Sequence, residues 1–240
     1  MAKNELFQYS IMSALMDGVA SHGIPIASML THGDHGLGTF KHMVGEMIVL
    51  DGVVYQMKSD GTVVPLDAAS LATTITPFAS VTRFQPTHTA RATITGKEGL
   101  SNLLTRLMPT AKNHFLAIRI DGVFSTIHVR TAGGQLEPRE KLPAVGNRQT
   151  THTFENARGT IIGFRTPQYM MGINVAGDHL HFISDDRERG GHILAFESEG
   201  EVDVGVALLS NFHLELPTED EEFNEAALVL DAKGIHAIEG

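Results

Sequence analysis

The sequence predicts an α+β fold in which β-strands predominate and a few helices flank the sheets. Three observations support this prediction. Apolar runs flank Asp-Gly dipeptides, a strong signal for a tight turn between two strands. Short apolar runs recur throughout the second half of the chain, and helical periodicity is confined to a few short segments. The pattern indicates two sheet-based subdomains rather than a helical bundle.

The N-terminal segment is predicted to form a helix, and a hairpin follows it. Apolar residues at helical spacing indicate an amphipathic helix over residues 4–17 that ends at Gly18. Further along, residues 46–50 and 53–57 indicate two strands joined by the turn Asp51-Gly52.

Two further Asp-Gly dipeptides extend the β-meander pattern. Asp60-Gly61 predicts a turn before another short strand. Residues 115–120 and 123–130 flank Asp121-Gly122 and predict a second hairpin. Between these hairpins, the leucines of residues 99–107 fall on one helical face, so we expect a short helix there.

A segment rich in Gly, Pro and charge, residues 131–147, is the best candidate for a domain boundary. We therefore expect an N-terminal mixed β-sheet domain with helices over residues 1–145. A C-terminal, mostly antiparallel and barrel-like β domain is expected over residues 146–240. Thr218 and Glu221 form a potential capping box for a late helix. Strands of the second domain are predicted at 160–164, 173–175, 180–183, 192–196 and 202–209.

Composition excludes several functional classes. The chain has 240 residues, of which 42% are hydrophobic and 19% charged, as in a globular protein. Its net charge of −10 argues against binding to nucleic acid, because phosphate recognition requires an excess of cations. It has no cysteine, which excludes thiol nucleophiles and thiolate metal sites. We find neither a signal peptide nor a membrane-spanning segment, so the expected location is the cytoplasm.

Histidines supply the strongest chemical signal. His179 and His181 stand two apart in a predicted strand, so their side chains point to the same face. The polar segment 184–191 then turns the chain and brings His192 beside them. Three imidazoles on one face can bind a metal and leave positions open for substrate. The same pattern also fits solvent-facing histidines of an ordinary hairpin.

Two charged residues are further candidates. Glu46 begins a strand at the edge of an apolar interior, where a carboxylate needs a cation or a proton. Arg130 ends another strand, where a fixed guanidinium binds a carboxylate well. Taken in isolation, each pattern is explained more simply by an exposed strand end. The glycine-rich segment 33–38 lacks the residues of a phosphate-binding loop. His35 within it, and His32 and His42 near it, are interpreted as loop or surface residues.

In combination, these motifs resemble those of the α-acetolactate decarboxylase family over nearly the whole chain and in the same order. The motifs that carry the resemblance are Gln8–Gly18, Gly33–Phe40, Gly45–Gly52, His128–Thr131, Thr166–Tyr169, Gly172–Arg187 and Gly190–His192. Two positions depart from the family pattern. His35 stands where an aromatic residue is common, and Asp178 stands where a bulkier residue is common.

The resemblance implies a role for each candidate residue. It implies that His179, His181 and His192 hold a divalent metal, usually zinc. Glu46 and Arg130 correspond to the catalytic glutamate and arginine of the family, and Arg130 also binds substrate. Thr39 corresponds to a threonine that lines the substrate pocket. The C-terminal glutamate that reaches the metal is best matched by Glu239.

The implied reaction is decarboxylation of (S)-2-acetolactate to (R)-acetoin and CO2 through a metal-stabilised enediolate, as a step of acetoin and butanediol formation. No organic cofactor is expected, because the ketone of the substrate serves as the electron sink. The implied partner is a small 2-hydroxy-3-oxo acid, and the implied assembly is a homodimer. Two alternatives stay open at this point: a cupin-like metalloenzyme (dioxygenase or isomerase), and a non-catalytic module that binds a metal or a sugar. The sequence does not decide whether Glu46 or Glu239 supplies the proton.

Overall fold

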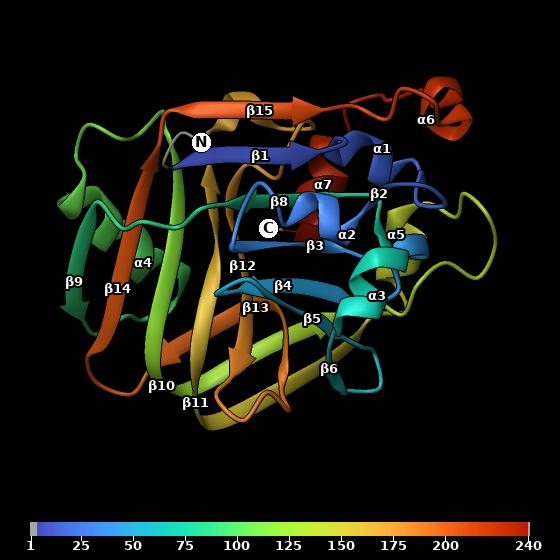
Figure 1. The fold of residues 1–240 in the computed structure, drawn as a ribbon. Helices are drawn as coiled ribbons and strands as arrows, with labels where there is room; N and C mark the ends of the chain where they lie inside the picture. Colours follow the sequence, from blue (N-terminus) through green and yellow to red (C-terminus); the bar gives the residue numbers. More distant parts are fainter. Residues whose placement is uncertain (1–3, 240) are drawn as a thin grey trace.

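Two large sheets form the body of the molecule in the computed structural model, which describes residues 4–239 (Figure 1). The first sheet is mixed, because one strand pair is parallel and the others are antiparallel. Its strands lie in the order β15 (Asn211–Glu215), β1 (Glu5–Tyr9), β8 (Ala79–Thr82), β3 (His35–Thr39), β4 (Glu46–Leu50), β5 (Val53–Met57) and β6 (Val63–Pro65). A separate pair joins β2 (Ile24–Pro25) and β7 (Ile75–Thr76).

The second sheet is antiparallel and barrel-like. Its strands are β11 (Thr150–Thr166), β12 (Gly177–Ser184), β13 (Gly190–Ser198), β10 (Phe115–Thr131), β14 (Val202–Leu209) and β9 (His88–Ala92). Strand β10 pairs with both β11 and β13, and β12 pairs with the same two strands. These four strands therefore form a closed circuit of pairings, which confirms the predicted sheet-based α+β architecture.

Helices cover the sheets and close one end of the molecule. Helix α4 (Gly96–Leu107) packs its leucines into the second sheet, while α2 (Ile26–Met29) and α3 (Ala68–Thr73) cover the outer face of the first. A cluster of buried side chains joins α1 (Met12–Met16), α5 (Leu142–Gly146) and α7 (Ala232–Glu239). The remaining helical turns are η1 (Lys41–Met43), η2 (Gln168–Met170) and α6 (Glu221–Glu225). Within residues 4–239, no helix is long and apolar enough to cross a bilayer.

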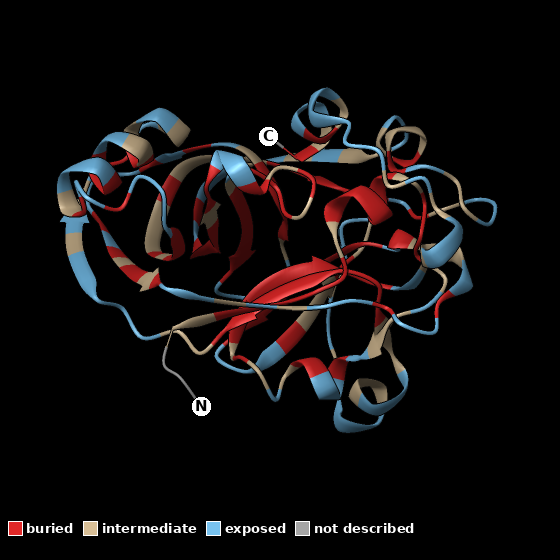
Figure 2. Cartoon of the chain, turned by 90° about the horizontal axis from the view of Figure 1, so that it is seen from above, coloured by how far each residue is buried: buried red, intermediate tan, exposed pale blue. Residues whose placement is uncertain are grey.

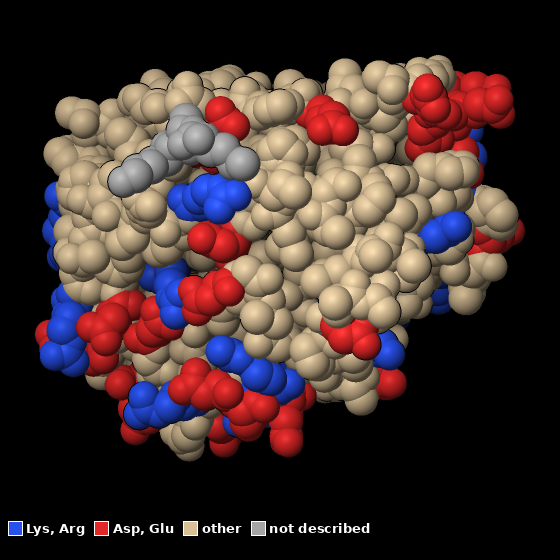
Figure 3. Space-filling view, viewed as in Figure 1, with Lys and Arg blue, Asp and Glu red and all other residues tan. Residues whose placement is uncertain are grey.

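The apolar core lies within and between the sheets. Figure 2 shows buried residues concentrated in the central strands and exposed residues in the peripheral helices. Leu37 and Ile48 of the first sheet pack with Ile162 and Phe164 of the second. Charged groups of both signs mix over the lower part of the face in Figure 3, and acidic groups gather near α6.

The predicted helix over residues 4–17 is wrong in its first half. Residues Glu5–Tyr9 form β1, and only Met12–Met16 are helical. Leu6 packs between the sheets while Phe7 packs on the opposite face. A strand buried on both faces is a continuous apolar run, which periodicity does not distinguish from a buried helix.

The predicted turn at Asp121-Gly122 is also wrong, because β10 runs through it as one strand of 17 residues. Asp121 accepts a hydrogen bond from Thr160 Oγ1 at 2.7 Å instead of leading a turn. A Cβ at Gly122 would lie 2.4 Å from Val202 Cγ1, so the glycine permits close strand approach. By contrast, the hairpin at Asp51-Gly52 and the helix near residues 99–107 are confirmed.

Two smaller predictions in the second half are wrong. Residues 173–175 form a tight loop, in which the Val175 N–H donates to Asn174 Oδ1 at 2.6 Å. The late helix begins at Glu221, and its N-cap is Asp220 rather than Thr218. Asp220 is the N-cap because its Oδ1 accepts a hydrogen bond from the Glu222 N–H at 2.9 Å.

The two sheets each combine segments from both sides of residue 145. Strands β9 and β10 precede this residue and lie in the second sheet, whereas β15 follows it and returns to the first. That residues 1–145 and 146–240 form two domains stays a prediction. The sheets themselves interleave along the chain.

Candidate metal centre and active site

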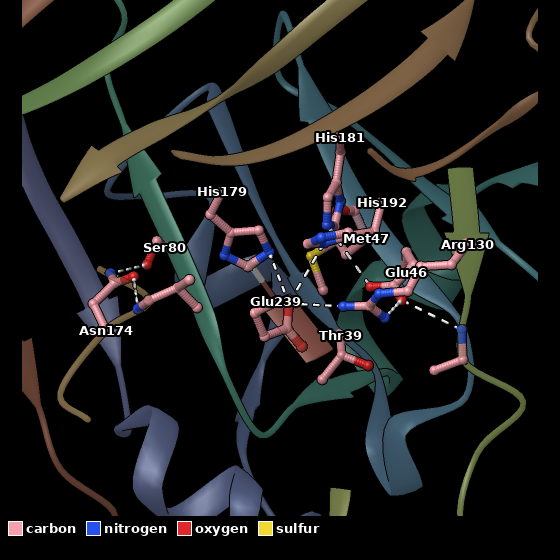
Figure 4. A network of polar contacts seen from close by, with 12 residues as sticks. Thr39, Glu46, Met47, Ser80, Arg130, Asn174, His179, His181, His192 and Glu239 are labelled. Carbon is pink, nitrogen blue, oxygen red and sulfur yellow. Dashed lines mark hydrogen bonds and ion pairs between the residues drawn. The ribbon is translucent and has the colours of Figure 1, made fainter. Parts of the chain in front are cut away.

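Three histidines converge where the second sheet faces the first (Figure 4). His179 and His181 share a face of β12, and His192 on β13 is the direct cross-strand neighbour of His181. Their ring centroids are 5.0–5.4 Å apart. Each ring offers a nitrogen within 4.8 Å of the nitrogens of the other two. The strand geometry anticipated from the sequence is therefore present.

The protonation state of these imidazoles suits a metal. Burial lowers the pKa of His181 to about 3, although a hydrogen bond to Met47 opposes the shift. Burial also holds the pKa of His179 and of His192 well below 6.5, and nearby cationic groups, including Arg130, add to the effect. All three rings are consequently neutral near pH 7, and neutral imidazole is the form that ligates metals.

Unpaired ring nitrogens show that a metal fits this site. The His181 Nδ1–H donates to the Met47 carbonyl oxygen at 2.8 Å, which leaves the Nε2 lone pair directed into the site. Among the described residues, His181 Nε2, His179 Nδ1 and both nitrogens of His192 are buried without a hydrogen-bond partner. Leaving such atoms unpaired is costly, and a borderline-soft divalent cation accepts imidazole lone pairs well.

A buried cation and two carboxylates lie beside the histidines. Arg130 on β10 is the cross-strand neighbour of His192 and is only 2% exposed. Its Nη1 lies 3.1 Å from Glu46 Oε1, and its Nη2 lies 2.9 Å from Glu239 Oε2. The guanidinium therefore joins the N-terminal strand β4 to the C-terminal helix α7.

The two carboxylates occupy different positions relative to the imidazoles. Glu239 Oε2 lies 3.4 Å from His179 Nε2 and 3.5 Å from His192 Nδ1. Glu46 Oε2 lies 3.7 Å from His181 Nε2, while its Oε1 also accepts the Ala132 N–H at 3.3 Å. Burial raises the pKa of Glu46 to about 7, an effect that Arg130 opposes and Glu239 strengthens.

The remaining walls of the cavity are mainly apolar. Thr39 lies opposite Glu46 in the β3–β4 ladder, and its hydroxyl donates to the Gly45 carbonyl at 2.9 Å. With its proton engaged, this hydroxyl can offer only lone pairs to a ligand. Apolar side chains complete the lining: Met12, Leu15, Met43, Phe78, Ala132 and Leu142.

All seven residues singled out from the sequence meet at this site, while the other early histidines lie elsewhere. His35 is buried between the sheets and stacks on Phe84 with ring centroids 4.5 Å apart. His32 stacks on Phe7, and His42 contacts Gln135. The interpretation of His35 as a loop or surface residue is therefore wrong, because strand β3 places its ring between the sheets.

Sequence reasoning missed two contributors. The Met47 carbonyl orients His181, but a backbone carbonyl has no signature in sequence. Lys97, on the first turn of α4, is half-buried, and burial lowers its pKa although Asp178 opposes the shift. The charge of Lys97 in turn contributes to the lowered pKa of His179. Asp178 is held by Arg165, with oxygens 2.6 and 2.7 Å from the guanidinium.

Comparison with known proteins places this arrangement in a family. The family model described as alpha-acetolactate decarboxylase matches residues 6–230. The alpha-acetolactate decarboxylase of Methanosarcina mazei is 39% identical over 224 residues, covering 93% of this chain and 76% of the relative. That of Bacillus subtilis is 37% identical over 240 residues, covering 99% and 91%.

Solved structures agree with the sequence comparison. The crystal structure of alpha-acetolactate decarboxylase from Bacillus subtilis strain 168 superposes with a TM-score of 0.91 at 36% identity, covering 98% of this chain and 99% of that one. A Staphylococcus aureus protein of unknown function, similar to alpha-acetolactate decarboxylase, gives the same TM-score at 30% identity and covers 98% and 100%. Match, coverage and fold together establish that the chain belongs to the alpha-acetolactate decarboxylase family.

Proposed function

We propose that this protein is a metal-dependent acetolactate decarboxylase that converts (S)-2-acetolactate to (R)-acetoin and CO2. The observation that carries the proposal is a buried guanidinium flanked by two carboxylates, directly beside three neutral imidazoles. Family membership supports the choice of reaction. Each polar group then has a task in the chemistry.

The three histidines would hold the metal, and we propose zinc, which accepts a set of imidazole and carboxylate ligands. A divalent metal in this position supplies Lewis acidity toward the ketone and hydroxyl oxygens of the substrate. Manganese, iron and nickel suit the same ligands. Metal analysis decides among them.

Arg130 binds the carboxylate that is lost. Its guanidinium is always protonated, and strands on both sides of β10 fix its position. Because the site is buried, a charge-assisted hydrogen bond from Arg130 is stronger than the same bond in water. Arg130 thereby orients the carboxylate and then balances the negative charge that develops on the remaining oxygens.

We assign different tasks to Glu46 and Glu239. Glu239 Oε2 lies between two imidazole nitrogens, so we propose that it completes the metal ligands. Glu46 lies on the other side of Arg130, and its Oε2 is 3.7 Å from the nearest imidazole nitrogen. We propose that Glu46 delivers the proton that replaces CO2 on the enediolate. Because Glu46 delivers this proton to one face of the enediolate only, it sets the configuration of acetoin.

The remaining residues that line the cavity orient the substrate and exclude water from it. Thr39 Oγ1 accepts a hydrogen bond from the hydroxyl group of the substrate, since its own proton is donated to the Gly45 carbonyl. Methionine, leucine and phenylalanine side chains exclude water and pack against the methyl groups of acetolactate. Resemblance to the family further supports a homodimer and a cytoplasmic location, which we propose on that ground.

Acetoin production from racemic acetolactate, measured before and after chelation, tests the function. We expect production to stop when a chelator removes the metal and to return when zinc is added. Bound metal at one ion per chain without any acetoin would instead favour a non-catalytic binding module. Absence of both metal and acetoin would refute the proposal.

A further inference from the structure

The side chains of the active site are almost fully buried in this structure, and little space is left between them. Thr39, Glu46, Arg130, Glu239 and the three histidines are each at most 7% exposed. The cavity lined by Thr39, Glu46, Arg130, His179 and Glu239 has a volume of about 20 Å³, which is room for one water molecule. Acetolactate carries a carboxylate, a ketone, a hydroxyl and two methyl groups, so it is several times larger. Part of the wall must therefore move before substrate enters.

The secondary structure indicates which part moves. Six of the seven polar residues stand on strands of the two large sheets: Thr39, Glu46, Arg130, His179, His181 and His192. Displacing the backbone of these residues requires breaking ladder hydrogen bonds with neighbouring strands. Glu239 is the exception, because it stands on α7, a helix of eight residues that belongs to no sheet.

Apart from the ion pair between Glu239 and Arg130, few interactions hold α7 against the body. Ile235 is its one fully buried apolar side chain, packed in the cluster with α1 and α5. Gly234 lies inside the helix and lowers its intrinsic stability. A crevice of about 220 Å³ between α5 and α7 is lined by Gly146 on one side and Ile238 on the other. Helices this short depend on packing for their stability. Among the short helices that line the cavity, α7 alone carries a charged residue of the site.

The segment before α7 suits a hinge. Val229 and Leu230 are 71% and 55% exposed, so they add little packing. Leu228 has a φ of +50°, a conformation that side chains rarely adopt. Its N–H donates to Asp17 Oδ2 at 2.9 Å, which ties the start of the segment to the end of α1. The tie fixes one end of the segment and leaves the exposed residues free to change conformation.

We propose that α7 is a lid that opens to admit substrate and release products, and that its closure returns Glu239 to Arg130, His179 and His192. Opening withdraws one carboxylate from the site, so the full set of charged groups assembles only around an enclosed substrate. The proposal rests on the proposed function in one respect, the size of the substrate. Access to the cavity is testable independently of the reaction.

A reversible covalent lock tests the lid. A Cβ built at Gly146 lies 3.6 Å from Ile238 Cγ1, so cysteines at these two positions are close enough to form a disulfide after a small adjustment. The chain has no cysteine of its own, which makes the pair unique. In the Gly146→Cys/Ile238→Cys protein loaded with zinc, we expect oxidation to lower kcat/KM for acetolactate at least about tenfold. Reduction by a phosphine should restore it.

A second readout does not depend on turnover. The rate at which a coloured chelator extracts zinc should also fall at least about tenfold on oxidation, because the metal lies behind the same wall. The Gly146→Cys/Ile238→Ser protein, which cannot form the lock, should respond to oxidant in neither assay. If thiol titration shows that the pair stays reduced, a short bis-maleimide closes it instead.

Each outcome has a distinct meaning. If the locked protein keeps its kcat/KM and its rate of zinc extraction, the proposal that α7 is a lid is wrong. A reduced protein that makes no acetoin, in parallel with an inactive wild type, contradicts the proposed function alone. Slower zinc extraction on locking would then still support the lid.

Discussion

Replacement of Arg130 by methionine removes the one guanidinium at the active site and keeps a side chain of similar length. Arg130 is 2% exposed, and its nitrogens lie 3.1 and 2.9 Å from oxygens of Glu46 and Glu239. Two unit charges about 4 Å apart interact by about 4 kcal/mol at an effective dielectric constant of about 20. Removing one partner of a buried ion pair costs about 3–5 kcal/mol, because the other charge remains buried.

We therefore expect the free energy of unfolding of the metal-free Arg130→Met protein to fall by about 3–5 kcal/mol near pH 8. Urea denaturation followed by circular dichroism measures this loss. The Arg130→Met/Glu46→Gln protein removes one of the stranded charges as well. Its stability should exceed that of the single variant, whereas independent contributions would make it lower.

Activity should respond differently from stability. With zinc restored, kcat/KM of Arg130→Met should fall by about 10²–10³-fold, the usual effect of losing one electrostatic contact to the transition state. Metal content should stay unchanged, and the double variant should be no more active. The reasoning is refuted if Arg130→Met keeps its wild-type kcat/KM, or if it loses less than about 1 kcal/mol of stability.

Three further predictions follow from other residues of the site and the core. His192→Ala should lose metal and activity together, because two imidazoles form a poor site; full metal content by elemental analysis with full turnover would exclude His192 as a ligand. Glu239→Gln should weaken zinc affinity, whereas Glu46→Gln should keep zinc and lose turnover; the reverse pattern in zinc titrations and rate assays would exchange the two roles. Burial lowers the pKa of His35 from 6.5 to about 4. As the pH falls from 6.5 to about 4, His35 is protonated in the unfolded chain but not in the folded one, so the free energy of unfolding decreases over this range. Between about pH 7 and pH 5, His35→Phe should therefore lose about 2 kcal/mol less unfolding free energy than the wild type in urea titrations, and equal losses would contradict the assignment.

Local patterns in the sequence were sufficient for part of this structure. The Asp51-Gly52 turn and the alternation of His179 and His181 depend on chemistry within a few residues, and both were predicted correctly. A strand places residues two apart on one face wherever it lies in the fold. The return of His192 beside His181 follows from one short turn between neighbouring strands.

Tertiary structure alone decided the rest. Glu5–Tyr9 is a strand because β15 and β8 pair on either side of it, and the partner β15 lies about 200 residues away. Strand β10 continues through Gly122 because β11 pairs along almost its whole length. Neither partner is encoded within the segment whose conformation it decides.

The active site shows the same division. Residue types and strand spacing indicated the three histidines and made Glu46 and Arg130 candidates, and family motifs indicated Thr39 and Glu239. Only the folded chain brings Glu46 within 3.1 Å of Arg130, which is 84 positions away in sequence. Burial, and with it the pKa of Glu46 and the neutrality of the imidazoles, arises from side chains of both sheets and of α7. Desolvation depends on everything that surrounds a group, so it is a property of the whole fold rather than of any segment.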